Sequence, residues 1–319
     1  MAMAAALPLI SFLLIVVAAT ATSAGSAATI FPREALPTKP GYLPIPVDNA
    51  SLYYAFYEAT SPLTPLASTP LLVWLEGGPG YSSFVSNFFQ IGPYVFPIAT
   101  GSASSSNTSS SASAFPLSPN PYACNRRFGL LFLESPLGTG YSPAPSPSAI
   151  PTSQPVVAEH VLAALRSFLS SQSPSFRARP LFLTGESYAG KTIPTVGALI
   201  LATNPALPQR QRINLRGVAI SNGFVHPVAQ VTTHVNVLYS AGLIGAKQRR
   251  EAEALQAEAV ALAIVERCRE AADSRERVLS WLRNATGLSS LFDVAVDTPR
   301  EALAAGAAEK MLTTQTNGC

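Results

Sequence analysis

Short apolar runs separated by turn residues constrain the fold of this chain more than any other feature of its sequence. Such runs are typical of strands buried on both faces of a sheet. They occur at 71–75, 130–133, 181–183 and 218–220, after an aromatic-rich run at 51–56 that also predicts a strand. Between the second and third runs, apolar residues recur at helical spacing over 154–169, with Thr152 or Ser153 as a plausible N-cap. Strands that alternate with helices predict an α/β fold with a mostly parallel sheet.

The size and composition of the chain are those of a globular protein. Its 319 residues are 48% hydrophobic and 12% charged, which excludes wholesale disorder. Lys and Arg number 21 and Asp and Glu 18, without a long basic run, so we expect no nucleic-acid partner. The three cysteines, Cys124, Cys268 and Cys319, have no metal-ligand spacing, and their odd number leaves the disulfide pairing open. The sequence therefore predicts neither a metal nor another cofactor.

Two segments depart from the alternation of strands and helices. The stretch 100–114 is rich in serine and is predicted to be a surface loop. The segment 248–276 is rich in Ala, Glu and Arg and predicts helix, and the back third of the chain has no strong strand signal. We therefore expect the back third to form a helical addition to the sheet.

The N-terminal segment predicts a secretory route. Residues 7–19 form an apolar stretch that is shorter than the about 20 residues needed to span a bilayer, so residues 1–24 are interpreted as a signal peptide. No later segment is apolar enough to span a membrane, and after removal of the signal we expect no membrane association. The N-x-S/T motifs at Asn49, Asn107 and Asn284 agree with this route and predict glycosylation.

A candidate nucleophile follows the third apolar run. The sequence Gly-Glu-Ser-Tyr-Ala-Gly at 185–190 places Ser187 between small residues at a strand-to-helix turn. This is the arrangement of a nucleophile elbow, in which the following helix directs N–H groups at a developing oxyanion. The alternative is an ordinary turn between a strand and a helix, since Ala189 stands where the G-x-S-x-G pattern has its second glycine.

A glycine-rich loop follows the first buried strand. It reads Trp-Leu-Glu-Gly-Gly-Pro-Gly-Tyr-Ser-Ser over 74–83. An oxyanion hole in this architecture takes one N–H from the residue after the serine, here Tyr188, and another from a loop after an earlier strand. Gly78 suits the second role because a residue without Cβ lets the backbone approach a substrate. Two such loops, each after a buried strand and in this order along the chain, are a more specific signal for an oxyanion hole than a single Gly-Pro turn.

Several motifs together resemble the plant serine carboxypeptidase-like family. They lie at 74–83, 120–122, 132–142, 185–190 and 219–223, with weaker similarity around 232–243. The resemblance implies an α/β-hydrolase fold, with a core at 25–224 and a helical insertion, truncated at its C-terminal end, at 225–319. It implies a Ser-Asp-His hydrolase that removes C-terminal residues from peptides at acid pH, outside the cell or in a vacuole. It also implies that the chain can form homodimers.

The resemblance assigns roles to individual residues. Ser187 is the expected nucleophile, Gly78 and Tyr188 the oxyanion donors, and Glu76, Gly77 and Glu186 the binding site for the substrate's C-terminal carboxylate. A carboxyl group binds a carboxylate only while it keeps a proton to donate.

The sequence departs from the family pattern in the glycine loop and near the site. Glu76 replaces the usual amide, so we expect that it must be neutral to bind a C-terminus, which moves activity to lower pH. Tyr81 replaces a cysteine and Cys124 a tryptophan. Glu186, before the serine, favours the peptidase branch of the family over its acyltransferase branch.

The general base is the missing part of the predicted site. After Ser187 the only histidines are His226 and His234, and both are interpreted as structural, as is the earlier His160. Without a base the serine hydroxyl is a poor nucleophile, so this polypeptide alone is expected to be nearly inactive. Three interpretations stay open: a serine carboxypeptidase with an incomplete sequence, a non-catalytic remnant, and an acyltransferase.

Overall fold

The computed structural model describes residues 32–96, 117–288 and 290–291, which are called the described residues below. The predicted signal peptide at 1–24, the serine-rich loop at 100–114 and the motif at Asn107 lie outside them. Cys319 and the rest of the predicted insertion from 292 onward also lie outside them. Among the described residues, no helix combines the length and the apolar character needed to cross a membrane.

A central sheet organises the described residues that precede the helical back third. Its strands are β1 (Lys39–Pro44), β2 (Ser51–Tyr57), β3 (Leu71–Leu75), β6 (Gly129–Leu133), β7 (Leu181–Glu186) and β8 (Leu215–Ser221). They lie in the order β1-β2-β6-β3-β7-β8. The pairs β6–β3, β3–β7 and β7–β8 are parallel, whereas β1–β2 and β2–β6 are antiparallel. All five predicted strands are confirmed, and the sheet is mostly parallel as expected.

The register of the parallel strands fixes which residues meet at the carboxyl edge of the sheet. Leu75, the last residue of β3, pairs with Leu133 of β6 on one side and with Gly185 of β7 on the other. The carboxyl ends of three strands are therefore level. Each of these three paired residues is followed in the sequence by a glutamate: Glu76, Glu134 and Glu186.

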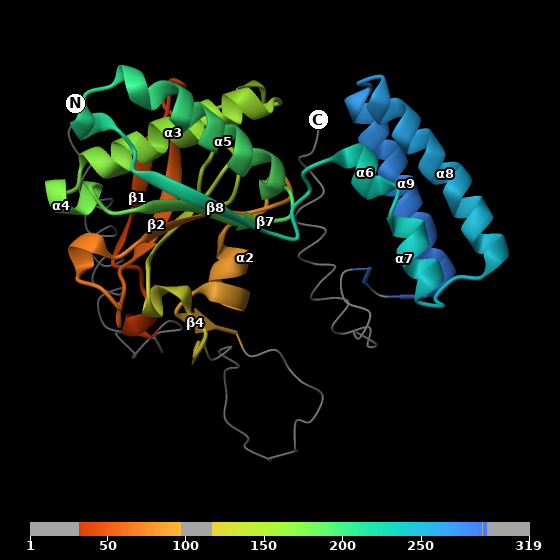
Figure 1. Ribbon diagram of the computed structural model, residues 1–319, viewed down its shortest axis with the longest axis horizontal. Coiled ribbons are helices and arrows are strands. Elements are labelled where there is room, and N and C mark those ends of the chain that lie inside the picture. The colour runs from red at the N-terminus through yellow and green to blue at the C-terminus, as the bar shows by residue number, and fades with distance from the viewer. Residues whose placement is uncertain (1–31, 97–116, 289, 292–319) are drawn as a thin grey trace, which may run out of the picture. The chain divides into compact units, whose positions relative to one another are not determined.

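Two long helices cover one face of the sheet (Figure 1). They are α3 (Gln154–Ser170) and α5 (Ala189–Thr203), which contact each other and share one hydrophobic core with the strands. The predicted helix over 154–169 is confirmed. Ser153 is its N-cap residue, although the Ser153 side chain makes no capping hydrogen bond. A second, smaller apolar cluster, which includes Tyr57, Trp74 and Phe132, lies outside this core and packs against Phe84.

Short elements connect the strands and the two long helices. They are η1 (Arg33–Ala35), η2 (Leu66–Ser68), α2 (Phe84–Ser86), η3 (Asn87–Ile91), β4 (Tyr94–Val95), β5 (Ser118–Pro119), η4 (Cys124–Arg126), η5 (Pro147–Ala149), α4 (Pro174–Arg177), η6 (Asn204–Ala206) and η7 (Gln209–Gln211). The element η3 is a π-helix. π-helical turns are rare in proteins, and those that occur are often located at functional sites.

The back third of the described chain is helical, as predicted (Figure 1). It contains α6 (Pro227–Val231), α7 (His234–Ser240), α8 (Ala246–Ile264) and α9 (Cys268–Thr286). The predicted helical segment 248–276 therefore falls on two helices with a break between them. These helices bury an apolar core of their own, formed by Val235, Leu238, Ile244, Ala252, Val278 and Leu282.

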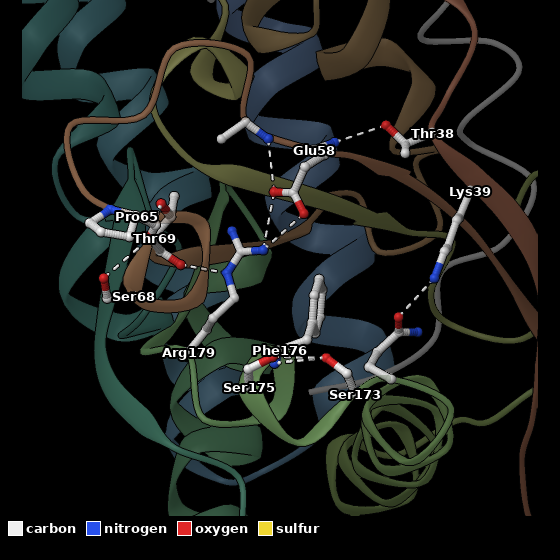
Figure 2. A network of polar contacts seen from close by, with 12 residues as sticks. Thr38, Lys39, Glu58, Pro65, Ser68, Thr69, Ser173, Ser175, Phe176 and Arg179 are labelled. Carbon is white, nitrogen blue, oxygen red and sulfur yellow. Dashed lines mark hydrogen bonds and ion pairs between the residues drawn. The ribbon is translucent and has the colours of Figure 1, made fainter.

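An ion pair between the buried Arg179 and the partly exposed Glu58 fastens the other end of the sheet (Figure 2). Arg179, just before β7, contacts both carboxylate oxygens of Glu58, just after β2, at 3.1 and 2.9 Å. Its Nε donates to the carbonyl oxygen of Thr69, before β3, at 2.6 Å, and its guanidinium lies 4.8 Å from the centre of the Phe176 ring. The Arg179 side chain is 1% exposed and that of Glu58 is 27% exposed. One side chain thus joins segments that flank three strands.

Candidate functional site

Ser187 lies in the turn between β7 and α5. Its backbone φ is 54°, a left-handed conformation that few residues other than glycine adopt, and its side chain is exposed. Three backbone hydrogen bonds hold it there: Ser187 N donates to Ser221 O at 3.0 Å, and Ser187 O accepts from Gly190 N at 3.0 Å and Phe224 N at 2.7 Å. Backbone strain of this kind persists only where its surroundings fix it, and it is concentrated at functional sites.

The glycine loop after β3 lies directly against Ser187. A Cβ atom added to Gly77 would be 2.8 Å from Ser187 Cβ and 3.2 Å from Ser187 Oγ, so only glycine fits without displacement. The next residue, Gly78, has a φ of 108°, which also favours glycine. Tyr188 is the N-cap of α5, and its side chain is buried. The predicted nucleophile, the Gly77–Gly78 loop and the first turn of α5 are therefore together at one edge of the sheet.

Glu76 is a buried carboxyl at the start of this loop. Its Oε2 accepts hydrogen bonds from Trp74 Nε1 at 3.1 Å and Ser86 Oγ at 2.5 Å, and its Oε1 accepts from Gly77 N at 3.2 Å. Burial raises the pKa of Glu76, and the nearby charge of Glu186 raises it further, although the three hydrogen bonds oppose this change. The expectation that Glu76 must be neutral to bind a C-terminus stays a prediction.

Ser86 and Gln90 are site residues that the sequence reasoning missed. Ser86 Oγ contacts Glu76 Oε2 and, at 3.2 Å, Gln90 Oε1, and Gln90 Nε2 donates to Glu186 Oε1 at 3.1 Å. The two predicted carboxylate-binding residues, Glu76 and Glu186, are therefore joined through two further side chains. Ser86 and Gln90 are four residues apart in the segment directly after the glycine loop. This spacing is the sequence signal that could have identified them.

A third carboxyl, that of Glu134, was also missed. It follows β6 and is 2% exposed, and its Oε1 accepts from Ser82 Oγ at 3.0 Å and from Ser83 N at 2.7 Å. Burial raises its pKa from 4.5 to about 7, against the effect of these hydrogen bonds. A glutamate at the carboxyl end of each of three parallel strands, directly after β3 and β6 and as the last residue of β7, is the sequence signal for this group.

Comparison with known proteins identifies the family. The model of the serine carboxypeptidase family matches residues 31–309. The chain belongs to the serine carboxypeptidase family. A relative, "Serine carboxypeptidase-like 50" of Arabidopsis thaliana, is 51% identical over 83% of this chain and 56% of its own length. "Serine carboxypeptidase S10 family member 1" of Dictyostelium discoideum is 34% identical over 77% of this chain and 54% of its own length. The chain thus spans about half the length of these relatives.

A solved structure of the family shares the fold. The prohormone-processing carboxypeptidase of Saccharomyces cerevisiae matches with a TM-score of 0.63 and 22% identity, over 77% of this chain and 52% of that one. Together with the mostly parallel sheet covered by helices, this match establishes the predicted α/β-hydrolase fold of this serine carboxypeptidase family member.

The three histidines of this family member lie in structural positions. His226 Nδ1 accepts a hydrogen bond from Ala229 N at 3.2 Å and so caps α6. His234 belongs to α7, and burial and the nearby charge of Arg275 lower its pKa to about 4. His160 is buried in α3, and burial lowers its pKa. Within the described residues, no side chain is hydrogen-bonded to Ser187 Oγ.

The remaining predictions concern cysteines and glycosylation. Cys124 is a free thiol whose pKa is raised by burial, whereas Cys268 is disulfide-bonded. Asn49 and Asn284 are exposed, Asn49 after β1 and Asn284 within α9. Glycosylation at both positions stays a prediction.

We expect the Glu134→Gln substitution to change how stability depends on pH. The folded protein keeps Glu134 protonated up to about pH 7, whereas the unfolded chain loses this proton near pH 4.5. The folded state binds more protons between these values, so the free energy of unfolding due to Glu134 falls as pH rises, by roughly 3 kcal/mol in all. Glutamine carries no proton to lose, so urea unfolding of the variant between pH 4.5 and 8 should lack this decline. Glu159→Gln on the exposed side of α3 is the matched control and should retain it, and a decline retained in Glu134→Gln would contradict the expectation.

Proposed function

We propose that Ser187 is the nucleophile of a serine carboxypeptidase that removes C-terminal residues from peptides. The observation that carries the proposal is the strained, exposed Ser187 in contact with the glycine loop. In this reaction Ser187 Oγ attacks the last peptide carbonyl and gives its proton to a base. The carbonyl oxygen, now negative, accepts hydrogen bonds from the N–H groups of Gly78 and Tyr188. The C-terminal amino acid leaves with a proton on its nitrogen, and water then hydrolyses the acyl-enzyme.

Recognition of the substrate's C-terminus is assigned to Glu76, Gly77 and Glu186. The arrangement that supports this role is that Glu76 and Glu186 directly precede Gly77 and Ser187, which are in close contact with each other. A substrate carboxylate is repelled by an ionised carboxyl and is bound by a protonated one. Burial raises the pKa of Glu76, which favours its protonated form at acid pH. Peptides with a free C-terminus are therefore the proposed substrates, and acid pH the proposed working condition.

The proposed reaction requires a proton acceptor that is not among the described residues. His226 caps α6, and burial and the nearby charge of Arg275 lower the pKa of His234 to about 4. Within the described residues no side chain is hydrogen-bonded to Ser187 Oγ, so we keep a second candidate function: a protein that binds peptide C-termini without cleaving them. The two candidates share the binding site and differ only in the activation of Ser187.

Labelling with a fluorophosphonate tests the activation of Ser187. The reagent reacts with a serine hydroxyl only when a base and an oxyanion hole activate it, so labelling of the full-length protein that disappears in Ser187→Ala would support the peptidase. Sequencing of the transcript through the Cys319 codon shows whether an Asp and a His follow. Absence of labelling, with retained binding of N-blocked dipeptides, would contradict the peptidase and favour the binding protein. Turnover of an acyl-glucose donor in place of the dipeptides would indicate acyl transfer.

We also propose that the protein enters the secretory pathway and functions outside the cell or in a vacuole. The predicted signal peptide and the exposed Asn49 and Asn284 support this assignment.

A further inference from the structure

A group of cationic and aromatic side chains lies beside the Ser187 turn. Two cations approach the ring of Phe224, which follows β8: Lys191 Nζ is 5.5 Å from the centre of this ring and Arg275 Cζ is 5.2 Å from it. Lys191 Nζ also lies 5.8 Å from the centre of the Tyr188 ring. Phe224 N donates to Ser187 O at 2.7 Å, so the group is in direct contact with the residue proposed as the nucleophile.

Neither cation has an anionic partner in the part of the chain that the structure describes. Lys191 and Arg275 form no ion pair there. The carboxylate of Glu276, next to Arg275 in the sequence, is paired with Arg283 at 3.3 Å. Arg275 Nε is buried, and none of the described residues accepts a hydrogen bond from it. A buried cation without an anion is unfavourable, and a contact with an aromatic ring offsets only part of this cost.

Lys191 stands where a helix usually favours an acidic residue. It belongs to the first turn of α5, in which no acidic residue occurs. The N–H groups at a helix N-terminus carry a partial positive charge, so a lysine there adds to the positive potential instead of neutralising it. Phe224 N lies against this turn, since a Cβ atom added to Gly190 would be 2.7 Å from it. The helix terminus and the two cations therefore all favour a negative charge near Phe224.

The neighbouring titratable group on α7 does not supply that negative charge. Burial and the nearby charge of Arg275 lower the pKa of His234 to about 4, so its ring is uncharged above that pH. Its Nε2 is buried and has no hydrogen-bond partner within the described residues. A neutral imidazole can donate or accept one hydrogen bond but cannot neutralise a cation. Burial also lowers the pKa of Lys191, in agreement with an ammonium group that lacks an anionic partner.

The strand order separates this cationic group from the glycine loop. In the order β3-β7-β8, the end of β3 and the following Gly77 are on one side of β7, whereas β8 and the following Phe224 are on the other. Glu76 and Gly77, on the β3 side, are proposed to bind the C-terminal carboxylate of a peptide. A peptide whose last peptide bond lies at Ser187 therefore directs its preceding residues toward the β8 side.

We propose that Lys191 and Arg275 bind an acidic side chain on the penultimate residue of the peptide, so that the protein selects peptides with Asp or Glu at that position. This selectivity rests on the proposed function, because the C-terminal carboxylate places the peptide. Hydrogen bonds from a lysine ammonium or an arginine guanidinium to a carboxylate are charge-assisted and stronger than those to a neutral amide. A penultimate glutamine, which is close to glutamate in shape but uncharged, should therefore bind more weakly.

Binding of two N-blocked dipeptides by the full-length protein measures the selectivity. N-acetyl-glutamyl-phenylalanine and N-acetyl-glutaminyl-phenylalanine differ only in the charge of the penultimate side chain, and the Ser187→Ala background prevents their cleavage. At about pH 5.5, where the glutamate side chain is ionised, we expect the Kd of the first to be about 10-fold lower than that of the second. Lys191→Met and Arg275→Met should each reduce this ratio to less than about 3-fold.

The control variants separate a local contact from the net charge of the protein. Arg269→Met removes the same charge from an exposed position of α9 and should leave the ratio of the two Kd values unchanged. Arg275→Lys keeps the charge and should retain a clear preference for the acidic peptide, which guards against loss of folding in Arg275→Met. Equal Kd values for the two peptides would overturn the proposal, and so would an equal loss of preference in Arg269→Met.

An NMR titration distinguishes failure of this proposal from failure of the proposed function. The full-length protein is labelled with carbon-13 at lysine Cε, and the Lys191 signal is assigned by its absence in Lys191→Met. N-acetylglutamate α-methylamide has the acidic side chain but no C-terminal carboxylate, and it should shift the Lys191 signal, whereas N-acetylglutamine α-methylamide should not. This shift without binding of either dipeptide would refute the proposed function alone. Absence of the shift would overturn the binding of an acidic side chain by Lys191, whether or not the dipeptides bind.

Discussion

Glu58→Leu should destabilise the fold by about 3–5 kcal/mol, because it leaves the charge of Arg179 buried without a partner. The Arg179 side chain is 1% exposed, and water cannot replace the lost carboxylate (Figure 2). Arg179→Met should cost less, since the carboxylate that it leaves behind is 27% exposed and can be hydrated. The free energy of unfolding in urea, measured at neutral pH, compares the two variants.

The double variant distinguishes a buried charge from a simple loss of packing. Glu58→Leu combined with Arg179→Met removes both charges, so we expect it to be more stable than Glu58→Leu alone. Glu258→Ala, in the exposed pair with Arg277, is the control and should cost less than about 1 kcal/mol. If Glu58→Leu were no more costly than this surface substitution, the ion pair would not be a major support of the sheet.

In full-length protein whose Ser187 is labelled by a fluorophosphonate, Gly77→Ala should reduce the rate of labelling by about 100-fold or more. The new methyl group would lie 2.8 Å from Ser187 Cβ, closer than Cβ atoms in folded proteins approach, and a tight 3.1 Å from the carbonyl oxygen of Glu186. Either the loop or the serine must move, and the distance between Ser187 Oγ and the oxyanion donors changes with it. The second-order rate constant for labelling of Ser187 measures this displacement.

A second glycine on the same structural unit provides the control. Gly197 lies within α5, and a Cβ there would meet its nearest atoms only at 3.9 Å. Gly197→Ala should therefore label at the wild-type rate and, as a helical glycine-to-alanine change, should not lower the thermal unfolding temperature. Equal labelling rates in Gly77→Ala and Gly197→Ala would show that the tight contact with Ser187 is unimportant for reactivity.

The strands and the Ser187 turn could be predicted because their signals are local. A buried strand between two helices is a continuous apolar run, as at 71–75, and a strained strand-to-helix turn needs small residues around Ser187. The roles of Glu76 and Glu186 came from resemblance, since no local pattern shows what a glutamate contacts. The break between α8 and α9 was not predicted, because the whole segment 248–276 consists of helix-forming residues.

The connections among the carboxyls depend on contacts between distant parts of the chain. Gln90 and Glu186 are 96 positions apart, Ser83 and Glu134 are 51 apart, and Glu58 and Arg179 are 121 apart. Hydrogen bonds over such separations exist only once the strand order β6-β3-β7 and its register have brought three strand ends level. The sequence by itself determined the α/β layers, the Ser187 turn and the glycine loop, because hydrophobic periodicity and glycine conformations act over a few residues. Only the tertiary structure decided which carboxyls are buried and what they contact, because burial and hydrogen bonding depend on neighbours from other strands.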